Sequence, residues 1–216
     1  MMLNEMEAKR LFSQYGIRVN DGIGVKTPAE AADAAEKLGF PVVVKVLSGK
    51  IIHKSDMGLV ALDIRTADCA RGACERILTA ARAIDPEATA VVEPMAPDGV
   101  AEVIIGGKRD PQFGPTVLFG LGGVFVEVFK DVSLRVAPVN HAIALKMIRE
   151  TKGYTILKGF RGKQGADLDA LADILVSISR LMMTREDVME LDVNPVIAYT
   201  HGAVAVDARV LLRDKD

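Results

Sequence analysis

Residues 28–46 read PAEAADAAEKLGFPVVVKV, which places an alanine-rich helix directly before a run of β-branched side chains. Thr27, Pro28 and Glu30 give this helix a typical N-terminal pattern, with a capping hydroxyl, a proline in the first turn and an acid three residues after the cap. Residues 42–46 are typical of a buried strand, because β-branched side chains pack well on a pleated sheet. This stretch predicts a fold in which helices and strands are mixed.

The same patterns recur along the chain and are interrupted at a proline-rich point. We expect helices at residues 4–15, 28–38, 67–84, 140–149 and 167–183, a glycine-containing connection between the last two, and strands at residues 41–46, 60–64, 89–93, 100–106, 116–119, 188–199 and 204–211. Pro94 and Pro97 predict a hinge. We therefore expect an α/β protein made of two α+β lobes, residues 1–94 and residues 95–216.

The composition is that of a globular protein and argues against several functional classes. Half of the 216 residues are hydrophobic, 26% are charged, and the formal net charge is −2. Because there is no basic tract and aromatic residues make up only 5%, we do not expect a nucleic-acid-binding surface. No apolar stretch approaches the roughly 20 residues that span a bilayer.

Two further features favour the cytoplasm. Cys69 and Cys74 are the only cysteines, and because they lie five residues apart on a predicted helix, we expect neither a disulfide nor a metal site. The N-terminal residues carry frequent charges and lack the apolar segment of a secretory signal. We expect a soluble cytoplasmic protein with no membrane or nucleic-acid partner.

Lys45 is the first candidate for binding a ligand, because it is the only charge in the strand of residues 42–46. The sequence contains no GxxxxGK[ST] motif and no GxGxxG after a strand, so a nucleotide would need other contacts. A buried ammonium must meet an anion, which makes Lys45 a candidate for binding nucleotide phosphates. The alternative is an edge strand on which Lys45 points to solvent.

The segment His53-Lys54-Ser55-Asp56 gathers an imidazole, an ammonium, a hydroxyl and a carboxylate beside Gly58. Histidine is the side chain that is largely neutral and nucleophilic near pH 7, so His53 is a candidate to accept a phosphoryl group and later release it. The alternative is a solvated surface turn.

Two acids and a backbone segment lie around the predicted hinge. Glu93 ends a strand directly before the hinge, and Glu102 lies on the next strand. Together with the backbone at Met95, they are candidates for contacts to the ribose and base of a nucleotide. The alternative for Glu93 is an exposed acid in a turn.

Oxygen donors also gather on the last two predicted strands. Period-two alternation places Glu190, Asp192 and Asn194 on one face, and pairing of the two strands would bring Asp207 beside Asn194. Asn194 and Asp207, with Asp192 as a helper, are therefore candidate ligands of Mg²⁺ that leave positions for water and phosphate. The alternative is the polar face of an amphipathic strand.

In their order, these segments resemble the ATP-grasp beta subunit of ADP-forming (NDP-forming) acyl-CoA synthetases, the family that includes ADP-forming acetyl-CoA synthetase. The resemblance covers nearly the whole chain and rests on VVVK (42–45), HKSD (53–56), VEPM (92–95), RDPQFGP (109–115), GLGGVFVE (120–127) and ELDVNP (190–195). HKSD and RDPQFGP with GLGGVFVE are its most specific parts. The chain departs from the usual pattern at Leu59, where members of the family have a second glycine.

The resemblance implies an ATP-grasp fold, in which two subdomains grip a nucleotide. It implies the reversible conversion of acyl-CoA, ADP and phosphate into free acid, CoA and ATP, with ATP or ADP and Mg²⁺ as cofactors. In that family a separate alpha part binds CoA, so the resemblance implies an alpha-subunit partner and a beta chain that is inactive alone. It implies the following roles: His53 as the phosphohistidine, Lys45 as the phosphate-binding lysine, Glu93 and Glu102 as nucleotide-binding acids, and Asn194 and Asp207, helped by Asp192, as the Mg²⁺ ligands.

The sequence leaves two other functions open. An ATP-grasp ligase that activates a carboxylate directly as an acyl phosphate for an amine would need no phosphohistidine. A non-catalytic nucleotide-sensing module would bind nucleotide without forming an acid-labile phosphate on the protein. The intact HKSD segment and the Asn194-Pro195 hairpin argue against the sensing module, which needs neither a nucleophile nor a complete metal site.

Overall fold

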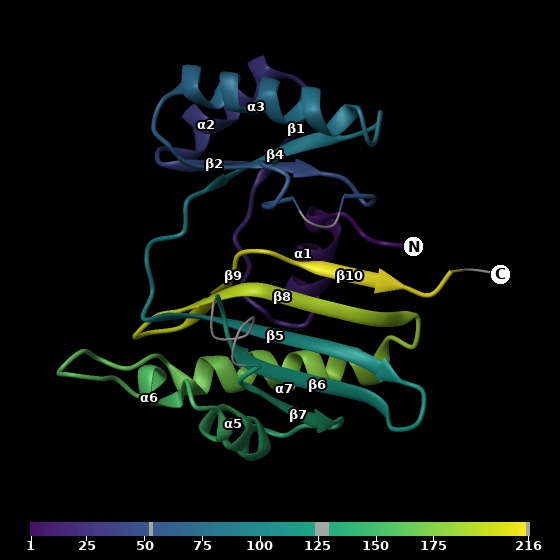
Figure 1. The fold of residues 1–216 in the computed structure, drawn as a ribbon, viewed down its shortest axis with the longest axis vertical. Helices are drawn as coiled ribbons and strands as arrows, with labels where there is room; N and C mark the ends of the chain where they lie inside the picture. Colours follow the sequence, from purple (N-terminus) through teal and green to yellow (C-terminus); the bar gives the residue numbers. More distant parts are fainter. Residues whose placement is uncertain (52–53, 124–129, 215–216) are drawn as a thin grey trace. The chain divides into compact units, whose positions relative to one another are not determined.

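The computed structural model describes residues 1–51, 54–123 and 130–214, and the chain forms two compact units. The N-terminal unit comprises Met2–Met6 and Asn20–Pro97, and the C-terminal unit comprises Met1, Glu7–Val19 and Asp98–Asp216. Each unit has its own antiparallel sheet with helices packed on it (Figure 1).

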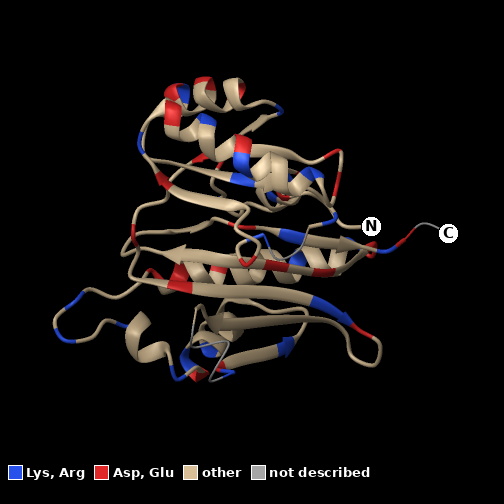
Figure 2. Ribbon diagram, turned by 45° about the horizontal axis from the view of Figure 1, so that its top comes forward, with Lys and Arg blue, Asp and Glu red and all other residues tan. Residues whose placement is uncertain are grey.

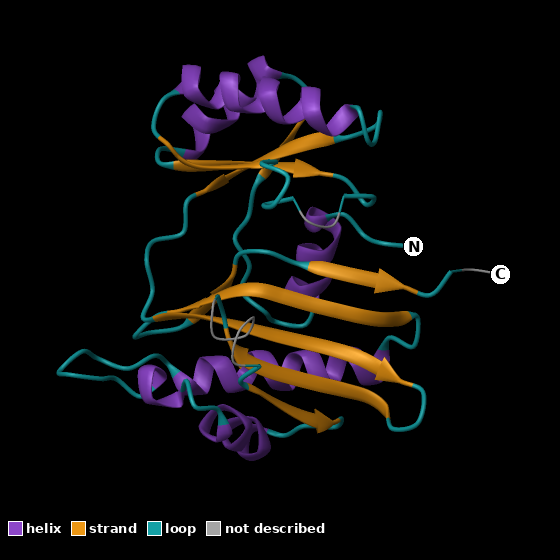
Figure 3. Ribbon diagram, in the orientation of Figure 1, coloured by secondary structure: helices purple, strands orange, loops and turns teal. Residues whose placement is uncertain are grey.

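The N-terminal unit is a four-stranded sheet with two helices on one face (Figure 3). The strands lie in the order β1-β4-β2-β3, with bounds β1 Ile23–Val25, β2 Val42–Leu47, β3 Val60–Ile64 and β4 Thr89–Pro94, and the helices are α2 Pro28–Leu38 and α3 Ala67–Arg82. The two helices bury short side chains such as Ala35 and Ala70, so they pack closely on each other and on the sheet. Figure 2 shows charged residues of both signs along them.

The C-terminal unit is a six-stranded sheet covered on one face by α5 and α7 (Figure 3). The strands lie in the order β10-β8-β5-β6-β7, and β9 also pairs with β8. The bounds are β5 Ala101–Asp110, β6 Gly114–Leu121, β7 Val132–Val136, β8 Val188–Ala198, β9 Ala203–Ala205 and β10 Arg209–Leu212, with α5 His141–Glu150, α6 Tyr154–Leu157 and α7 Leu168–Thr184. Helix α1, Glu5–Gln14, starts in the N-terminal unit, and its residues from Glu7 onward belong to this one.

Close packing between α7 and β5 requires glycine at position 107. A Cβ added to Gly107 would lie 2.8 Å from Cγ of Met182 and 3.4 Å from Cγ2 of Ile178, both on α7. Gly107 therefore lies on the face of β5 that packs against α7. Because successive side chains of a strand point to opposite faces of the sheet, Glu102 lies on the other face.

The RDPQFGP segment is a structural turn between β5 and β6. One carboxylate oxygen of Asp110 accepts hydrogen bonds from the backbone N–H groups of Gln112 (2.8 Å) and Phe113 (2.9 Å). The Arg109 guanidinium donates to three carbonyls where α7 ends and β8 begins, those of Met182 (2.8 Å), Arg185 (3.2 Å) and Val188 (3.3 Å). This motif therefore ties the turn to the C-terminal end of α7, where helix carbonyls lack partners within the helix.

The structure confirms the predicted helices and differs in the short or edge elements. Strand β1, helix α6 and edge strand β7 were not predicted as elements, and β5 continues to Asp110, beyond the expected end at Gly106. The expected single strand at residues 204–211 is two strands, β9 and β10, interrupted at residues 206–208. Three- and four-residue elements are too short to show a period. Among the described residues, no helix is long and apolar enough to cross a membrane.

Candidate functional site

Lys45 lies inside the N-terminal sheet, because β2 is flanked by β4 and β3. The alternative of an edge strand with a solvent-facing lysine is therefore wrong. The Lys45 side chain is only 5% exposed, and its ammonium lies 2.9 Å from the Glu5 carboxylate and 3.0 Å from the Glu93 carboxylate. The anion that a buried ammonium requires is thus supplied within this unit by two acids.

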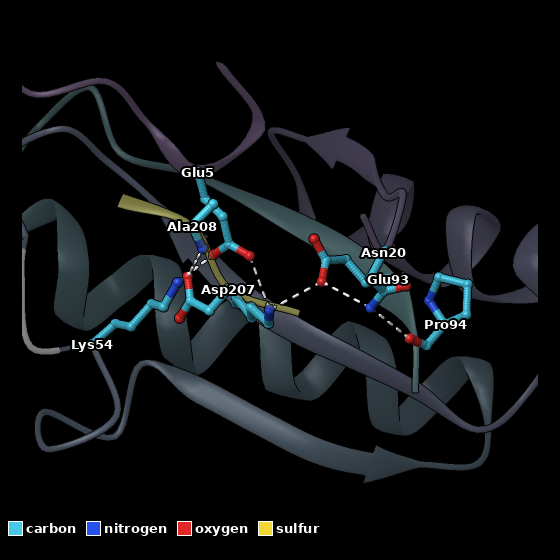
Figure 4. A network of polar contacts seen from close by, with 8 residues as sticks. Glu5, Asn20, Lys54, Glu93, Pro94, Asp207 and Ala208 are labelled. Carbon is cyan, nitrogen blue, oxygen red and sulfur yellow. Dashed lines mark hydrogen bonds and ion pairs between the residues drawn. The ribbon is translucent and has the colours of Figure 1, made fainter. Parts of the chain in front are cut away.

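These contacts belong to a larger buried network (Figure 4). The Glu5 carboxylate also forms an ion pair with Lys54, and the Asn20 amide donates to Glu93 (3.2 Å) and to the carbonyl of Pro94 (3.0 Å). The Glu93 side chain is 1% exposed, so the alternative of an exposed turn acid is wrong. Two lysines and two glutamates therefore share one buried cluster in this unit.

His53 lies outside the described residues, but the turn that follows it is described. The carbonyl of Lys54 accepts from the backbone N–H of Leu59 (2.8 Å), and the carbonyl of Leu59 accepts from that of Val46 on β2 (3.0 Å). Gly58 takes the left-handed conformation (φ 68°), and Leu59 is buried in the core at 1% exposure. Leu59 in place of the usual glycine therefore anchors the turn and leaves the unusual backbone angle to Gly58.

Met95 and Glu102 occupy different units. The backbone N–H of Met95 donates to the carbonyl of Pro41 (2.9 Å), so the carbonyl of Met95 is the better candidate for reading a base edge. Glu102 is exposed on β5, and its own carbonyl accepts from the backbone N–H of Gly122 (2.7 Å). A Cβ at Gly122 would lie 3.0 Å from that oxygen, which explains the glycine at this position.

Asn194 and Asp207 come together as the sequence predicted. β8 pairs Asp192 with Arg209 and Val196 with Ala205, so the intervening positions place Asn194 opposite Asp207. On its other side, β8 pairs with β5, where Val196 lies opposite Val103 and Val193 lies opposite Ile105. Between these two pairs, β8 has one residue more than β5. The extra residue is a β-bulge around Asn194-Pro195, a feature that often re-aims side chains beside active sites.

The donors on this strand pair suit a hard divalent cation. Asn194 supplies an amide oxygen and Asp207 a carboxylate, and Asp192 lies 3.8 Å from the guanidinium of Arg209, which offsets part of its charge. Within the described ranges, no group of three or more His, Cys, Asp or Glu residues could hold a metal. Mg²⁺ is commonly held by one or two carboxylates together with phosphate oxygens and waters, so this small set fits Mg²⁺.

Two residues of interest were missed by the sequence analysis. Arg209 lies two residues after Asp207 and faces Asp192 and Glu190 at 3.8 and 4.0 Å; the same alternation that selected Asp192 would have found it. Glu5 gave no signal, because it is separated from Lys45 by 40 residues.

Arg135 and the two cysteines have surroundings that suit structural roles. Arg135, on the edge strand β7, forms an ion pair with Glu150. Cys69 is exposed and Cys74 is buried, and burial raises the pKa of the Cys74 thiol to about 11. The ion pair of Arg135 and the burial of Cys74 support structural roles.

Comparisons of sequence agree with this fold. A family model described as an ATP-grasp domain matches residues 1–212. The beta subunit of acetate–CoA ligase (ADP-forming) I from Pyrococcus furiosus is 46% identical over 213 residues, which cover 97% of this chain and 91% of that subunit. Acetate–CoA ligase (ADP-forming) I from Archaeoglobus fulgidus is 43% identical over 212 residues, but the chain spans only 31% of that longer protein.

Solved structures give the same result. The dinucleotide-forming acetyl-coenzyme A synthetase 1 of Ca. Korarchaeum cryptofilum, in complex with coenzyme A and Ca-AMPCP, matches with a TM-score of 0.93 and 46% identity over 98% of this chain and 93% of that chain. Another structure of that protein contains coenzyme A and Mg-AMPPCP, and its phosphohistidine segment points towards the nucleotide-binding site; it matches with a TM-score of 0.85 and 45% identity over the same shares of both chains.

Proposed function

Because this chain belongs to the ATP-grasp family and, within it, to the beta subunits of ADP-forming acetate–CoA ligases, we propose that it transfers phosphate between a histidine and ADP or ATP. In the complete enzyme this step would contribute to the reversible reaction of acyl-CoA, ADP and phosphate to give acid, CoA and ATP.

The observation that carries the proposal is the register of β8 with β9 and β10, which brings Asn194 opposite Asp207 at a bulge. We assign Asn194 and Asp207 as ligands of Mg²⁺, with Asp192 as a helper. When bound, Mg²⁺ supplies positive charge that offsets the charge of the nucleotide phosphates. Phosphoryl transfer depends chiefly on such charge neutralisation and on alignment.

We assign the nucleotide contacts to Lys45, Glu93, Met95 and Glu102. Lys45 would offset phosphate charge, and its position is fixed by the two carboxylates at 2.9 and 3.0 Å. Glu93 and Glu102 are the acids proposed for the nucleotide, and the Met95 carbonyl is proposed for the base. A nearly buried lysine with fixed neighbours offers phosphate a pre-organised charge, which costs little reorganisation on binding.

His53 is the proposed nucleophile. A neutral imidazole nitrogen would attack the γ-phosphorus of ATP, forming the N–P bond as the bond from phosphorus to the β–γ bridging oxygen breaks and ADP leaves. The reverse step would return the phosphoryl group to ADP. The phosphohistidine segment of the Korarchaeum protein supports this assignment, because that protein is 45% identical to this chain.

We further propose that a CoA-binding alpha subunit completes the enzyme in the cytoplasm. Support comes from the Pyrococcus relative, which is named as a beta subunit, and from the Archaeoglobus relative, of which this chain spans only 31%. The chain without its partner should then make no ATP from acyl-CoA, ADP, phosphate and Mg²⁺. Robust ATP synthesis by the purified chain would refute the two-subunit proposal.

The central test is to incubate the chain with labelled ATP and Mg²⁺ and to map any phosphate that is labile in acid and stable in base. We expect label on His53 and none in His53→Ala. Nucleotide binding without label would favour a sensing module. Amine-dependent ligase activity that survives in His53→Ala would favour a carboxylate–amine ligase.

A further inference from the structure

The C-terminal unit contains a pocket of about 750 Å³ to which the proposed phosphoryl transfer gives no role. Three parts of this unit line the pocket: the residues directly before β5, helix α6 with the segment that follows it, and the turn after β8. The lining includes Asp98, Ile156, Phe160, Arg161, Lys163 and Tyr199. Pockets that bind small molecules have volumes of about 300–1,000 Å³, so this one is large enough for a ligand the size of a nucleotide.

The three parts that line the pocket are joined by backbone hydrogen bonds. The N–H of Val100 donates to the carbonyl of Ala198 (2.7 Å), which connects the residues before β5 to the end of β8. The N–H of Asp167 donates to the carbonyl of Tyr199 (2.8 Å), which connects the segment after α6 to the same end of β8. The walls of the pocket are therefore held in place by the fold, and a pre-formed site lowers the cost of ordering on binding.

The segment between α6 and α7, which projects from the helices in Figure 1, is closed on itself. The N–H of Ala166 donates to the carbonyl of Leu157 (2.7 Å), and a Cβ added to Gly165 would lie 2.7 Å from that carbonyl oxygen. A Cβ added to Gly159 would lie 2.6 Å from the carbonyl oxygen of Lys163. Glycine at these two positions therefore lets the segment fold back closely and present a fixed surface to the pocket.

This segment is also basic. Residues 151–166 include four lysines or arginines and no acid, and Figure 2 shows the blue of these residues along it. Two of the four, Arg161 and Lys163, line the pocket, and neither forms an ion pair with any residue that the structure describes. Against these two cations the described lining has one acid, Asp98. The pocket therefore has a net positive charge and favours an anion, and the guanidinium of arginine matches a phosphate group in geometry.

Aromatic and apolar side chains form the rest of the wall. Phe160 is 54% exposed, and the guanidinium carbon of Arg161 lies 5.2 Å from the centre of its ring. Arg161 has a left-handed backbone (φ 51°), which is uncommon for a residue other than glycine and is found most often at functional sites. Ile156 and Tyr199 add apolar surface nearby. An exposed phenylalanine beside a cation suits a ligand that combines a flat ring with a negative group.

We propose that this pocket binds a phosphate ester that carries a planar ring, the chemical class that includes nucleotides. Arg161 and Lys163 bind the phosphate, and Phe160 stacks on the ring. A phosphate dianion is favoured over a carboxylate because it offsets both cations. Tyr199 follows Asn194 by five residues along β8, which at about 3.3 Å per residue is roughly 15 Å. The pocket is thus separate from the proposed Mg²⁺ ligands, and its ligand binds whether or not the chain transfers phosphate.

The test uses phenyl phosphate as the probe and the full, isotopically labelled chain without Mg²⁺, followed through its amide signals by NMR. We expect saturable shifts at residues 158–166 and 199–200, with a dissociation constant on the order of 1 mM for so small a ligand. Arg161→Gln should raise this constant about tenfold, and Phe160→Ala should raise it several-fold. The matched control is Lys152→Gln, because Lys152 is an exposed cation of the same basic segment that lies outside the described lining; it should bind as the wild type does.

Two further ligands separate the ring from the phosphate. Inorganic phosphate lacks the ring and phenylacetate carries a single negative charge, so each should bind several-fold more weakly than phenyl phosphate. Equal affinity for inorganic phosphate would overturn the role of Phe160, and equal affinity for phenylacetate would overturn the preference for phosphate. Shifts that lie only in other parts of the chain would overturn the site. Lys163→Gln serves if Arg161→Gln does not fold, and wild-type affinity in either variant would also refute the proposal.

Discussion

Removing the ammonium at the centre of the buried network should destabilise the protein strongly. Lys45→Met keeps a side chain of similar length but leaves Glu5 and Glu93 without the cation that lies 2.9 and 3.0 Å away. At 3 Å and an effective dielectric constant of 20, each pair has an attraction of about 5 kcal/mol, most of which offsets the cost of burying the charges. Removing one partner from a buried pair costs about 3–5 kcal/mol. Because Glu5 retains Lys54 and Glu93 retains Asn20, we expect a loss of about 3 kcal/mol, at the lower end of that range.

The free energy of unfolding is measured by urea denaturation followed by circular dichroism. In a thermal scan the same loss corresponds to a midpoint lower by about 6–12 °C for a chain of this size. The matched control is Lys50→Met, because Lys50 also pairs with a buried acid, Asp85 at 3.0 Å, but is 69% exposed. The control should lose less than about 1 kcal/mol. If Lys45→Met is as stable as Lys50→Met, the buried ion pairs of Lys45 do not stabilise the fold as proposed.

Three further predictions concern other parts of the chain. Arg109→Met removes the donor to three carbonyls at the end of α7 and should cost about 2–3 kcal/mol in urea denaturation; an unchanged midpoint would contradict the role given to RDPQFGP. The pKa of Asp167 is lowered, first by the N–H of Ala170 at the start of α7. A lowered pKa stabilises the fold at pH values above the ordinary 3.8, and this stabilisation is lost as the carboxyl protonates at lower pH. Asp167→Ala should therefore lower the free energy of unfolding by about 1 kcal/mol at pH 7, and by less as the pH falls below 3.8. A loss of stability that does not depend on pH would contradict this. With a thiol-reactive reagent, exposed Cys69 should react in the folded protein and buried Cys74 only after unfolding, and equal rates would contradict the packing of α3.

Local sequence chemistry predicted the longer elements because their signals are local. The cap predicted at Thr27 is confirmed by a hydrogen bond from the Glu30 N–H (3.2 Å). The helix predicted at residues 140–149 is likewise capped, since the Asn140 side chain accepts from the Ile143 N–H (2.9 Å). The order of strands in each sheet was not predictable in this way, since β2 pairs with β4 across the whole of α3. Whether Lys45 lay at an edge or in the interior therefore had to come from the structure.

The candidate site also contains residues that local patterns predict and residues that only long-range contacts reveal. Asn194 and Asp207 were predicted together because alternation and antiparallel pairing relate residues on adjoining strands. Glu5 was not predicted, because its contact with Lys45 spans 40 residues and its place at the start of a helix is ordinary for an acid. The domain boundary at residues 94–95 and the functional roles of all the candidate site residues stay predictions.

The most direct measurement is a chase of the labelled protein. The chain is labelled with ATP and Mg²⁺, freed of nucleotide, and mixed with unlabelled ADP and Mg²⁺. We expect that the label leaves His53 and is recovered in ATP, and that Asp207→Asn slows this return. Label that stays on the protein, or that is released only as inorganic phosphate, would contradict the claim that this chain passes phosphate between a histidine and a nucleotide.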